Sequence, residues 1–212
     1  MTIPFYNNTK DDTHCVQACL KSVLKFYFPQ KDYSFNYLDK VTAHKKGKWT
    51  WNSAFLLFLA NKDFEVINIE DFNYKKFSKY GESFLKKNWT EEMFLVQKKF
   101  SDLKNEQKLA GKLVQNKKVI LKMKPAMLHD IRLLFKKGYI LLSVVNPYVL
   151  ERRKGYASHL VVIISLGEKT ITFHDPGLPP LKNRKTSLKL FLKAMRYPSK
   201  ESANLIAVKK IR

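Results

Sequence analysis

The chain has 212 residues, of which 45% are hydrophobic and 13% aromatic; this excludes a disordered chain and predicts one domain over residues 1–212. Its 40 lysines and arginines outnumber 18 acidic residues, and the formal net charge of +22 is spread over almost every segment. No apolar run is long enough to span a membrane and no secretory signal begins the chain, so we expect a cytoplasmic protein without a transmembrane segment.

The first helix is predicted over residues 13–28, where apolar residues recur at helical spacing until Pro29. Residues suited to an N-cap precede it: Asp11, Asp12 and Thr13. Cys15 therefore lies in the first turn, where unpaired backbone N–H groups and the helix dipole favour a thiolate. A reactive cysteine is expected there. Cys19, one turn later among apolar residues, is expected to be an inert thiol, and both cysteines are expected to be reduced.

The middle of the chain is predicted to be mainly helical. Helices are expected over 34–40 (capped by Ser34), 52–61, 73–80, 81–87, 90–105, 106–116, 127–137 and 187–195, and strands over 65–69, 119–121, 139–145 and 203–208. Helices come first and strands cluster late, which is typical of the α+β class.

A hairpin is predicted after the strand over 139–145 and before the helix over 187–195. Its parts are a strand over 155–164, a turn over 166–169 and a returning strand over 170–175. Because the end of the second strand lies beside the start of the first, His159 and Asp175 are expected to lie close together. With Cys15 they would supply a nucleophile, a base and an orienting carboxylate.

These segments resemble the papain-like cysteine peptidases, and among them the bacteriocin-processing leader-peptidase family. The matching pieces are Cys15-Val16-Gln17-Ala18-Cys19-Leu20, His159-Leu160-Val161-Val162, and Asp175-Pro176 sixteen residues after the histidine. The resemblance implies a papain-like α+β fold whose helical half carries the nucleophile helix and whose antiparallel sheet carries His159 and Asp175. It also implies a stand-alone peptidase domain that cleaves a peptide or isopeptide bond of a peptide or protein substrate through an acyl-enzyme, with no cofactor.

Two positions depart from the family pattern. Val16 stands where the family usually has glycine, and Thr9 stands where it has the glutamine that helps to form the oxyanion hole. Asn7 and Asn8 lie just upstream, so either amide is a possible oxyanion donor together with the Cys15 backbone N–H, with Gln17 as the next choice. The departures leave open a weak or inactive relative that binds a peptide.

Other interpretations of the composition remain beside this one. The lysines indicate either a solvated surface or an acidic partner, and a basic nucleic-acid-binding protein is a third function, although no zinc-finger, RNP or helix-turn-helix pattern is present. His14, Cys15 and Cys19 are clustered, but they lack a second paired set of ligands, so no metal site is predicted. His174 is expected to be structural, and Trp49 and Trp51 to be either core or cleft wall.

Overall fold

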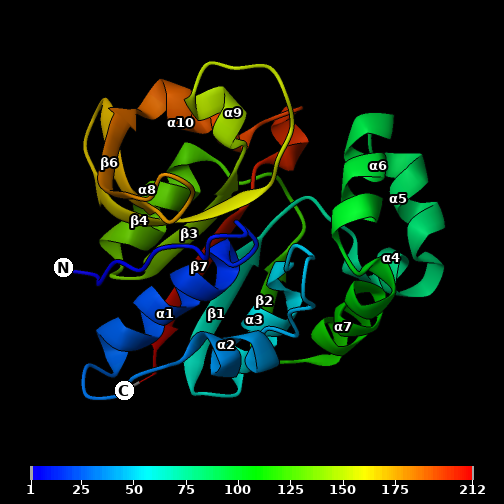
Figure 1. Cartoon of the computed structure of the whole chain (residues 1–212), viewed down its shortest axis with the longest axis horizontal. Helices are drawn as coiled ribbons and strands as arrows, with labels where there is room; N and C mark the ends of the chain where they lie inside the picture. The colour runs from blue at the N-terminus through cyan, green and yellow to red at the C-terminus, as the bar shows by residue number, and fades with distance from the viewer. Residues whose placement is uncertain (1, 212) are drawn as a thin grey trace.

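The computed structural model describes residues 2–211 and is built on one seven-stranded sheet (Figure 1). The strand order is β2-β1-β7-β3-β4-β5-β6; β1 and β2 are parallel, and the other neighbours are antiparallel. The strands are β1 Phe64–Ile69, β2 Val119–Lys122, β3 Ile140–Val145, β4 His159–Leu166, β5 Thr170–Asp175, β6 Leu181–Ser187 and β7 Leu205–Lys210. The described helices are α1 Cys15–Tyr27, α2 Phe35–Val41, α3 Asn52–Ala60, α4 Tyr74–Tyr80, α5 Glu82–Asn88, α6 Glu91–Phe100, α7 Leu103–Gln115, α8 Leu128–Lys136, α9 Pro147–Leu150 and α10 Leu188–Met195.

The central strands are buried on both faces, because helices cover each face (Figure 1). Leu142 and Val162 are cross-strand partners whose side chains join the apolar cluster formed with α1 and α3. Leu141 and Ile163 are the next pair along the strands, and they join the cluster formed with α8 and α10. Successive strand residues therefore point to opposite faces. The result is a helix, sheet, helix sandwich with α1 fixed against one face.

The mixed α+β class predicted from the sequence is confirmed, and most expected elements are present. The predicted helix over 90–105 is wrong as a single element: α6 ends at Phe100, Ser101 forms a bridge with Trp49, and Asp102 caps α7. Three described elements were not predicted. These are β6, whose sequence LKNRKTS has no apolar alternation, the one-turn helix α9, and the short 3-10 helix Lys200–Ser202.

The predicted cap of α1 also needs correction. The N-cap is His14, which makes no side-chain capping bond. Asp11 and Thr13 instead hydrogen-bond to each other, with 3.0 Å between Thr13 Oγ1 and Asp11 Oδ2, and Asp12 accepts a bond from Asn8. These side chains therefore stabilise the turn before the helix, and they do not cap the first N–H groups of α1.

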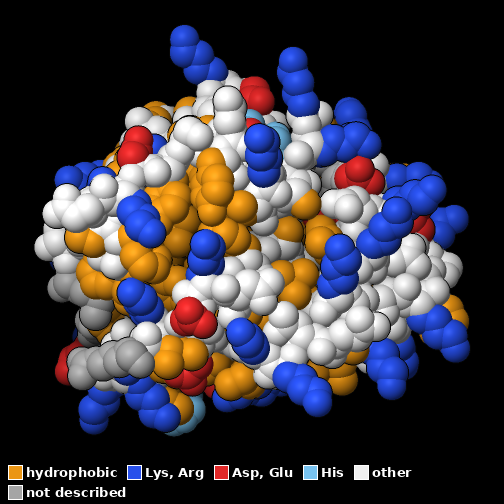
Figure 2. All heavy atoms as spheres, turned by 90° about the horizontal axis from the view of Figure 1, so that it is seen from below, with side chains coloured by type: hydrophobic (Ala, Val, Ile, Leu, Met, Phe, Trp, Pro, Cys, Tyr) orange, Lys and Arg blue, Asp and Glu red, His pale blue; other side chains and the backbone are white. Residues whose placement is uncertain are grey.

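Positive side chains are dispersed rather than gathered into one stripe on the face in Figure 2, where apolar side chains are exposed between them. Among residues 2–211, no helix combines the length and apolar character needed to cross a lipid bilayer.

Candidate active site

The position of Cys15 follows from the packing of α1 on the sheet. Residues from Val16 to Leu20 are buried, and the Cys19 thiol donates to the backbone oxygen of Leu160 over 3.3 Å. Leu160 immediately follows His159, the first residue of β4. One helical turn separates Cys19 from Cys15, so this contact places the start of α1 beside the start of β4. Burial raises the pKa of Cys19 well above its usual value, which makes it the unreactive thiol of the two.

His159 and Asp175 meet where the β4–β5 hairpin brings the start of one strand to the end of the other. His159 Nε2 lies 2.7 Å from Asp175 Oδ1, and the side chains are only 9% and 6% exposed. Because a carboxylate accepts, Nε2 carries the proton in this bond. The other ring nitrogen, Nδ1, is left for a second partner. Cys15 and His159 both line the same cleft.

Asp175 is held by more than the histidine. Arg184 of β6 donates from Nη1 to Asp175 Oδ2 over 2.8 Å, and the Gly177 backbone N–H donates to Oδ1 over 3.1 Å. Arg184 is itself anchored by Glu151, whose Oε1 lies 2.5 Å from its Nη2. Both oxygens of a nearly buried carboxylate are thus satisfied, and the ring that it holds has one orientation.

The electrostatics favour a charged pair at neutral pH. Burial alone would raise the pKa of Asp175, but the hydrogen bond and charge of His159, with Arg184, lower it to about 2. Burial likewise opposes protonation of His159, yet the hydrogen bond to Asp175 and the nearby Cys15 thiol raise its pKa to about 10.

The two asparagines expected at the oxyanion hole lie in different environments. Asn8 is buried, and its Oδ1 accepts from the backbone N–H groups of His14 and Thr9 over 2.7 and 2.9 Å. Its Nδ2 donates to Asp12 Oδ1 over 2.7 Å, which occupies one of its two N–H groups. Asn7 is exposed. Asn8 is therefore the one whose side chain is held at the start of α1.

Two other side chains considered from the sequence have partners away from the His159–Asp175 pair. Gln17 donates through Nε2 to Thr42 and Thr50 over 2.8 and 3.0 Å, so its amide protons are engaged. His174 contacts the Ile3 backbone oxygen through Nε2 over 2.9 Å and accepts from the Asn183 N–H through Nδ1. That double anchoring agrees with a structural role for His174.

A cleft of about 630 Å³ extends from Cys15 and His159 along the sandwich. Its aromatic lining includes Trp51, which donates through Nε1 to Gln97 and Ser101 over 2.9 and 3.0 Å. Of the two tryptophans left open by the sequence, Trp51 is therefore the cleft wall, whereas Trp49 stacks on Phe100 with 4.9 Å between ring centroids.

Sequence reasoning did not assign Arg184 or Gly177 to the site, and it considered Asp12 only as a helix cap. Arg184 lies in β6 opposite Phe173, in a strand without a recognisable pattern. Gly177 follows the expected Asp-Pro pair, and a Cβ at this position would lie 3.3 Å from His159 Nε2. Asp12 has a φ of 55°. Its pKa is raised overall, because burial outweighs the opposing charge of His159. Only Gly177 had a local signal, because it directly follows a motif residue.

Comparison with known proteins gives one informative result. No protein-family model matches the chain, and no curated protein matches it significantly. The solved structure of the peptidase domain of Streptococcus ComA, a bi-functional ABC transporter involved in a quorum sensing pathway, is similar with a TM-score of 0.53 and 13% identity. The similarity covers 99% of this chain and 100% of that one. The resemblance inferred from three short segments is thus confirmed at the level of the fold: the chain shares the fold of that peptidase domain.

Proposed function

We propose that the protein is a papain-like cysteine hydrolase that cleaves a peptide or isopeptide bond. The observation that carries this proposal is the buried His159–Asp175 hydrogen bond at the edge of the cleft that Cys15 also lines. A histidine held by a carboxylate and facing a helix-terminal cysteine is the arrangement that nucleophilic catalysis requires. The similarity in fold to a peptidase domain supports the same reaction class.

In the proposed mechanism the Cys15 thiolate attacks the carbonyl carbon of the scissile bond. The proton taken from the thiol resides on His159 Nδ1, since Nε2 donates to Asp175. His159 passes this proton to the leaving amine as the C–N bond breaks, which leaves a thioester on Cys15. Water then attacks the thioester, His159 accepts its proton, and the thiol is restored as the acid product leaves.

The developing oxyanion needs donors that are in place before the reaction. We assign these to the Cys15 backbone N–H, which belongs to the free first turn of α1, and to the Nδ2 proton of Asn8 that Asp12 does not take. One such donor is typically worth about 3 kcal/mol in the transition state. Asn7, being exposed, is the weaker choice.

The cleft favours a substrate with apolar side chains. Five large apolar side chains line it: Trp51, Phe72, Phe84, Trp89 and Met93. The rest of the lining is rich in polar residues, so these side chains form an apolar section of a mixed cleft, and such sections are suited to burying substrate side chains. We therefore expect cleavage next to large hydrophobic residues of a peptide.

The first test does not require the substrate. Iodoacetamide should alkylate Cys15 much faster than Cys19, and the reaction should persist below pH 7, where a thiol with a pKa of about 8.5 has mostly stopped reacting. His159→Ala should remove the low-pH reactivity. Rates are measured against pH, and the modified cysteine is located by peptide mass. Equal labelling of both cysteines, or an unchanged profile in His159→Ala, would reject the pairing of Cys15 with His159.

The second test separates catalysis from binding. A mixture of peptides is incubated with the parent protein or with Cys15→Ala, and new termini are identified by mass spectrometry. Cleavage by the parent alone supports the hydrolase. If neither protein cleaves and both retain the same peptides, the protein is instead the peptide-binding relative that the departures at Thr9 and Val16 left open.

A further inference from the structure

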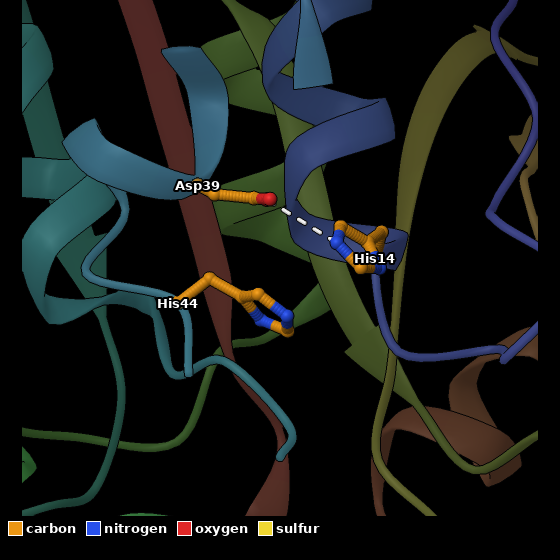
Figure 3. Close-up of side chains that lie close together, drawn as sticks. All are labelled: His14, Asp39 and His44. Atoms are coloured by element: carbon orange, nitrogen blue, oxygen red, sulfur yellow. Dashed lines mark ion pairs between the residues drawn. The ribbon is translucent and has the colours of Figure 1, made fainter. Parts of the chain in front are cut away.

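Two histidines and one aspartate outside the candidate active site lie close together near the start of α1. They are His14, the N-cap of α1; Asp39, in α2; and His44, in the loop after α2. Figure 3 shows the three side chains pointing toward a common space. One potential ligand atom from each residue lies within 4.8 Å of the other two. The peptidase mechanism uses none of the three.

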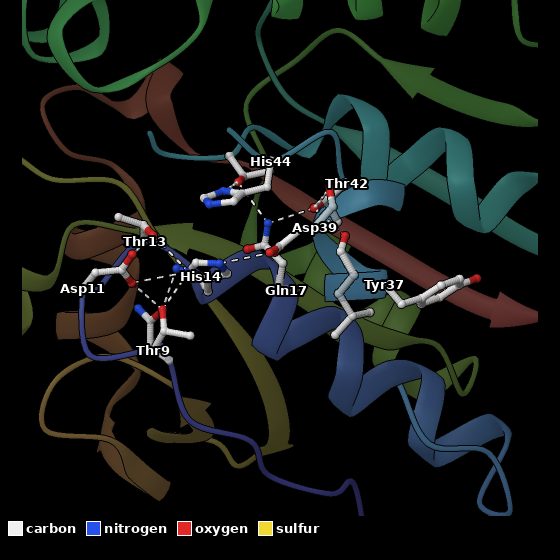
Figure 4. Close-up of polar contacts among 12 residues, drawn as sticks. Thr9, Asp11, Thr13, His14, Gln17, Tyr37, Asp39, Thr42 and His44 are labelled. Carbon is white, nitrogen blue, oxygen red and sulfur yellow. Dashed lines mark hydrogen bonds and ion pairs between the residues drawn. The ribbon is translucent and has the colours of Figure 1, made fainter. Parts of the chain in front are cut away.

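The hydrogen bonds around this group orient the histidines as metal ligands are oriented. His14 Nδ1 lies 2.6 Å from Thr9 Oγ1 and 2.9 Å from Thr13 Oγ1 (Figure 4). His44 Nδ1 lies 2.9 Å from Thr50 Oγ1. A histidine that binds a metal through one ring nitrogen usually engages the other in such a bond. In both residues Nε2 is thereby left for another partner.

The carboxylate provides the second, independent observation. Asp39 Oδ1 is buried and accepts no hydrogen bond from any residue between 2 and 211, although it lies 3.3 Å from His14 Nε2. A buried oxygen without a hydrogen bond is costly and is unusual in a folded protein. A bound cation would satisfy it.

The two imidazole rings are also unusually close, with centroids 4.2 Å apart. If both were protonated they would repel each other, whereas two neutral rings can share one cation. Gln17, one turn after His14, has a second buried oxygen that lacks a hydrogen-bond partner within the described chain, and its Nε2 donates to the Thr50 hydroxyl that holds His44. Two buried oxygens in this region, Asp39 Oδ1 and Gln17 Oε1, therefore lack a hydrogen-bond donor among the described residues, and a cation bound at Asp39 would compensate the first.

We propose that His14, Asp39 and His44 bind one divalent transition metal of the Zn²⁺ class. Each histidine contributes Nε2 and Asp39 contributes its carboxylate, with water completing the tetrahedron. Two imidazoles and one carboxylate form a donor set found in zinc sites with an open position, and imidazole disfavours Mg²⁺ and Ca²⁺. Bound metal would tie the start of α1 to α2 and the following loop, so it would also stabilise the fold.

The test uses Zn²⁺ as the probe and the Cys15→Ser protein as the starting point. A thiol beside His159 can bind zinc by itself, and removing Cys15 eliminates that signal. Isothermal titration should then give one bound Zn²⁺ per chain, no comparable binding of Mg²⁺, and a higher melting temperature with Zn²⁺. These readouts involve no catalysis, so the proposed hydrolase can fail while the metal site stands, and the reverse.

Three variants, added to Cys15→Ser, localise the site. His44→Ala and the isosteric Asp39→Asn should each abolish the stoichiometric binding, and Thr50→Val should weaken it about 10- to 100-fold by freeing His44 Nδ1. His129→Ala removes an exposed histidine outside the group and should leave the affinity unchanged. Melting without metal verifies that each variant is folded. Absence of Zn²⁺ binding to Cys15→Ser would overturn the proposal. So would a Zn²⁺ affinity in the folded His44→Ala and Asp39→Asn variants that equals that of Cys15→Ser alone.

Discussion

Two histidine–carboxylate pairs lie on either side of the start of α1, and they differ in how completely their polar atoms are used. His159 and Asp175 are 2.7 Å apart, and Arg184 and Gly177 satisfy the remaining capacity of the carboxylate. His14 and Asp39 are 3.3 Å apart, and Asp39 Oδ1 has no hydrogen bond from residues 2–211.

The difference matches the two proposed roles, proton transfer for His159 and Asp175 and metal binding for His14 and Asp39. A general base needs one orientation and one protonation partner, so a closed network around it is useful. A metal site needs oriented ligands with free lone pairs, so an incomplete network is useful there. Both can occur beside one helix start because His14 and Cys15, although adjacent in sequence, serve different pairs.

The largest expected effect comes from removing the histidine of the fully hydrogen-bonded pair, His159 and Asp175, which we call the closed pair. His159→Ala should lower peptide turnover by about 10²- to 10⁴-fold, because the thiol loses its base and the leaving amine loses its acid. Turnover is measured on a peptide identified by the cleavage experiment. In the Cys15→Ser background the same substitution should leave Zn²⁺ affinity unchanged. Loss of zinc binding in that variant would show that the two pairs are not separate.

The next prediction sharpens the role of the turn between the pairs. Asn8→Asp keeps the oxygen that accepts from the His14 N–H but removes the proposed oxyanion donor, so turnover should fall about 10²- to 10³-fold. Adding Asp12→Asn reverses the direction of the bond between positions 8 and 12 and should restore the melting temperature. Turnover should stay low in this double variant. Its recovery together with stability would assign Asn8 a structural role alone.

The third prediction concerns the ion pair between Arg184 and Asp175, which satisfies the second oxygen of the buried carboxylate. Arg184→Met leaves Asp175 Oδ2 buried without its cation and should reduce the free energy of unfolding by about 3 kcal/mol, as measured by urea denaturation. Arg132→Met, which removes an exposed arginine, is the matched control and should change stability little.

The same variant has a defined pH dependence. Asp175 has a pKa of about 2 in the folded protein, below its unfolded value of about 3.9, so its stabilisation is present above that unfolded value and is lost as the pH falls through about 2. Removing Arg184 raises the folded pKa. The stabilisation contributed by Asp175 should therefore be smaller than in the parent, and its loss on acidification should be complete at a higher pH; an acid limb that coincides with the parent's would contradict the assigned ion pair.

The sequence predicted those parts of the site that depend on local pattern. Apolar spacing defined the helix that begins at Cys15, and turn residues defined the hairpin, so the approach of His159 and Asp175 followed from register alone. Their catalytic roles with Cys15 remain a prediction. Arg184 could not be found this way, because β6 is an edge strand whose place depends on pairing with β5.

The second pair was equally out of reach of sequence reasoning. His14, Asp39 and His44 are spread over thirty residues, and their proximity is set by the packing of α2 beside α1. Neither the spacing of the histidines nor the single carboxylate matches a recognised metal motif. The absence of a predicted metal site therefore reflected the lack of local pattern, whereas the proposal rests on tertiary contacts.

The smallest expected effect tests how tightly the closed pair is packed. A Cβ on Gly177 would lie 3.1 Å from Asp175 Oδ1 and 3.3 Å from His159 Cε1, so these atoms must move by a few tenths of an ångström to accept it. Gly177→Ala should therefore lower kcat by about 3- to 10-fold with little change in KM, because the imidazole shifts relative to Cys15. Gly111→Ala, in α7, is the control: a Cβ there would meet its nearest neighbour, Cβ of Ser78, at 3.7 Å, which is ordinary contact. An unchanged kcat in Gly177→Ala, with the parent's melting temperature, would mean that the pair tolerates displacement and that its precise geometry does not limit turnover.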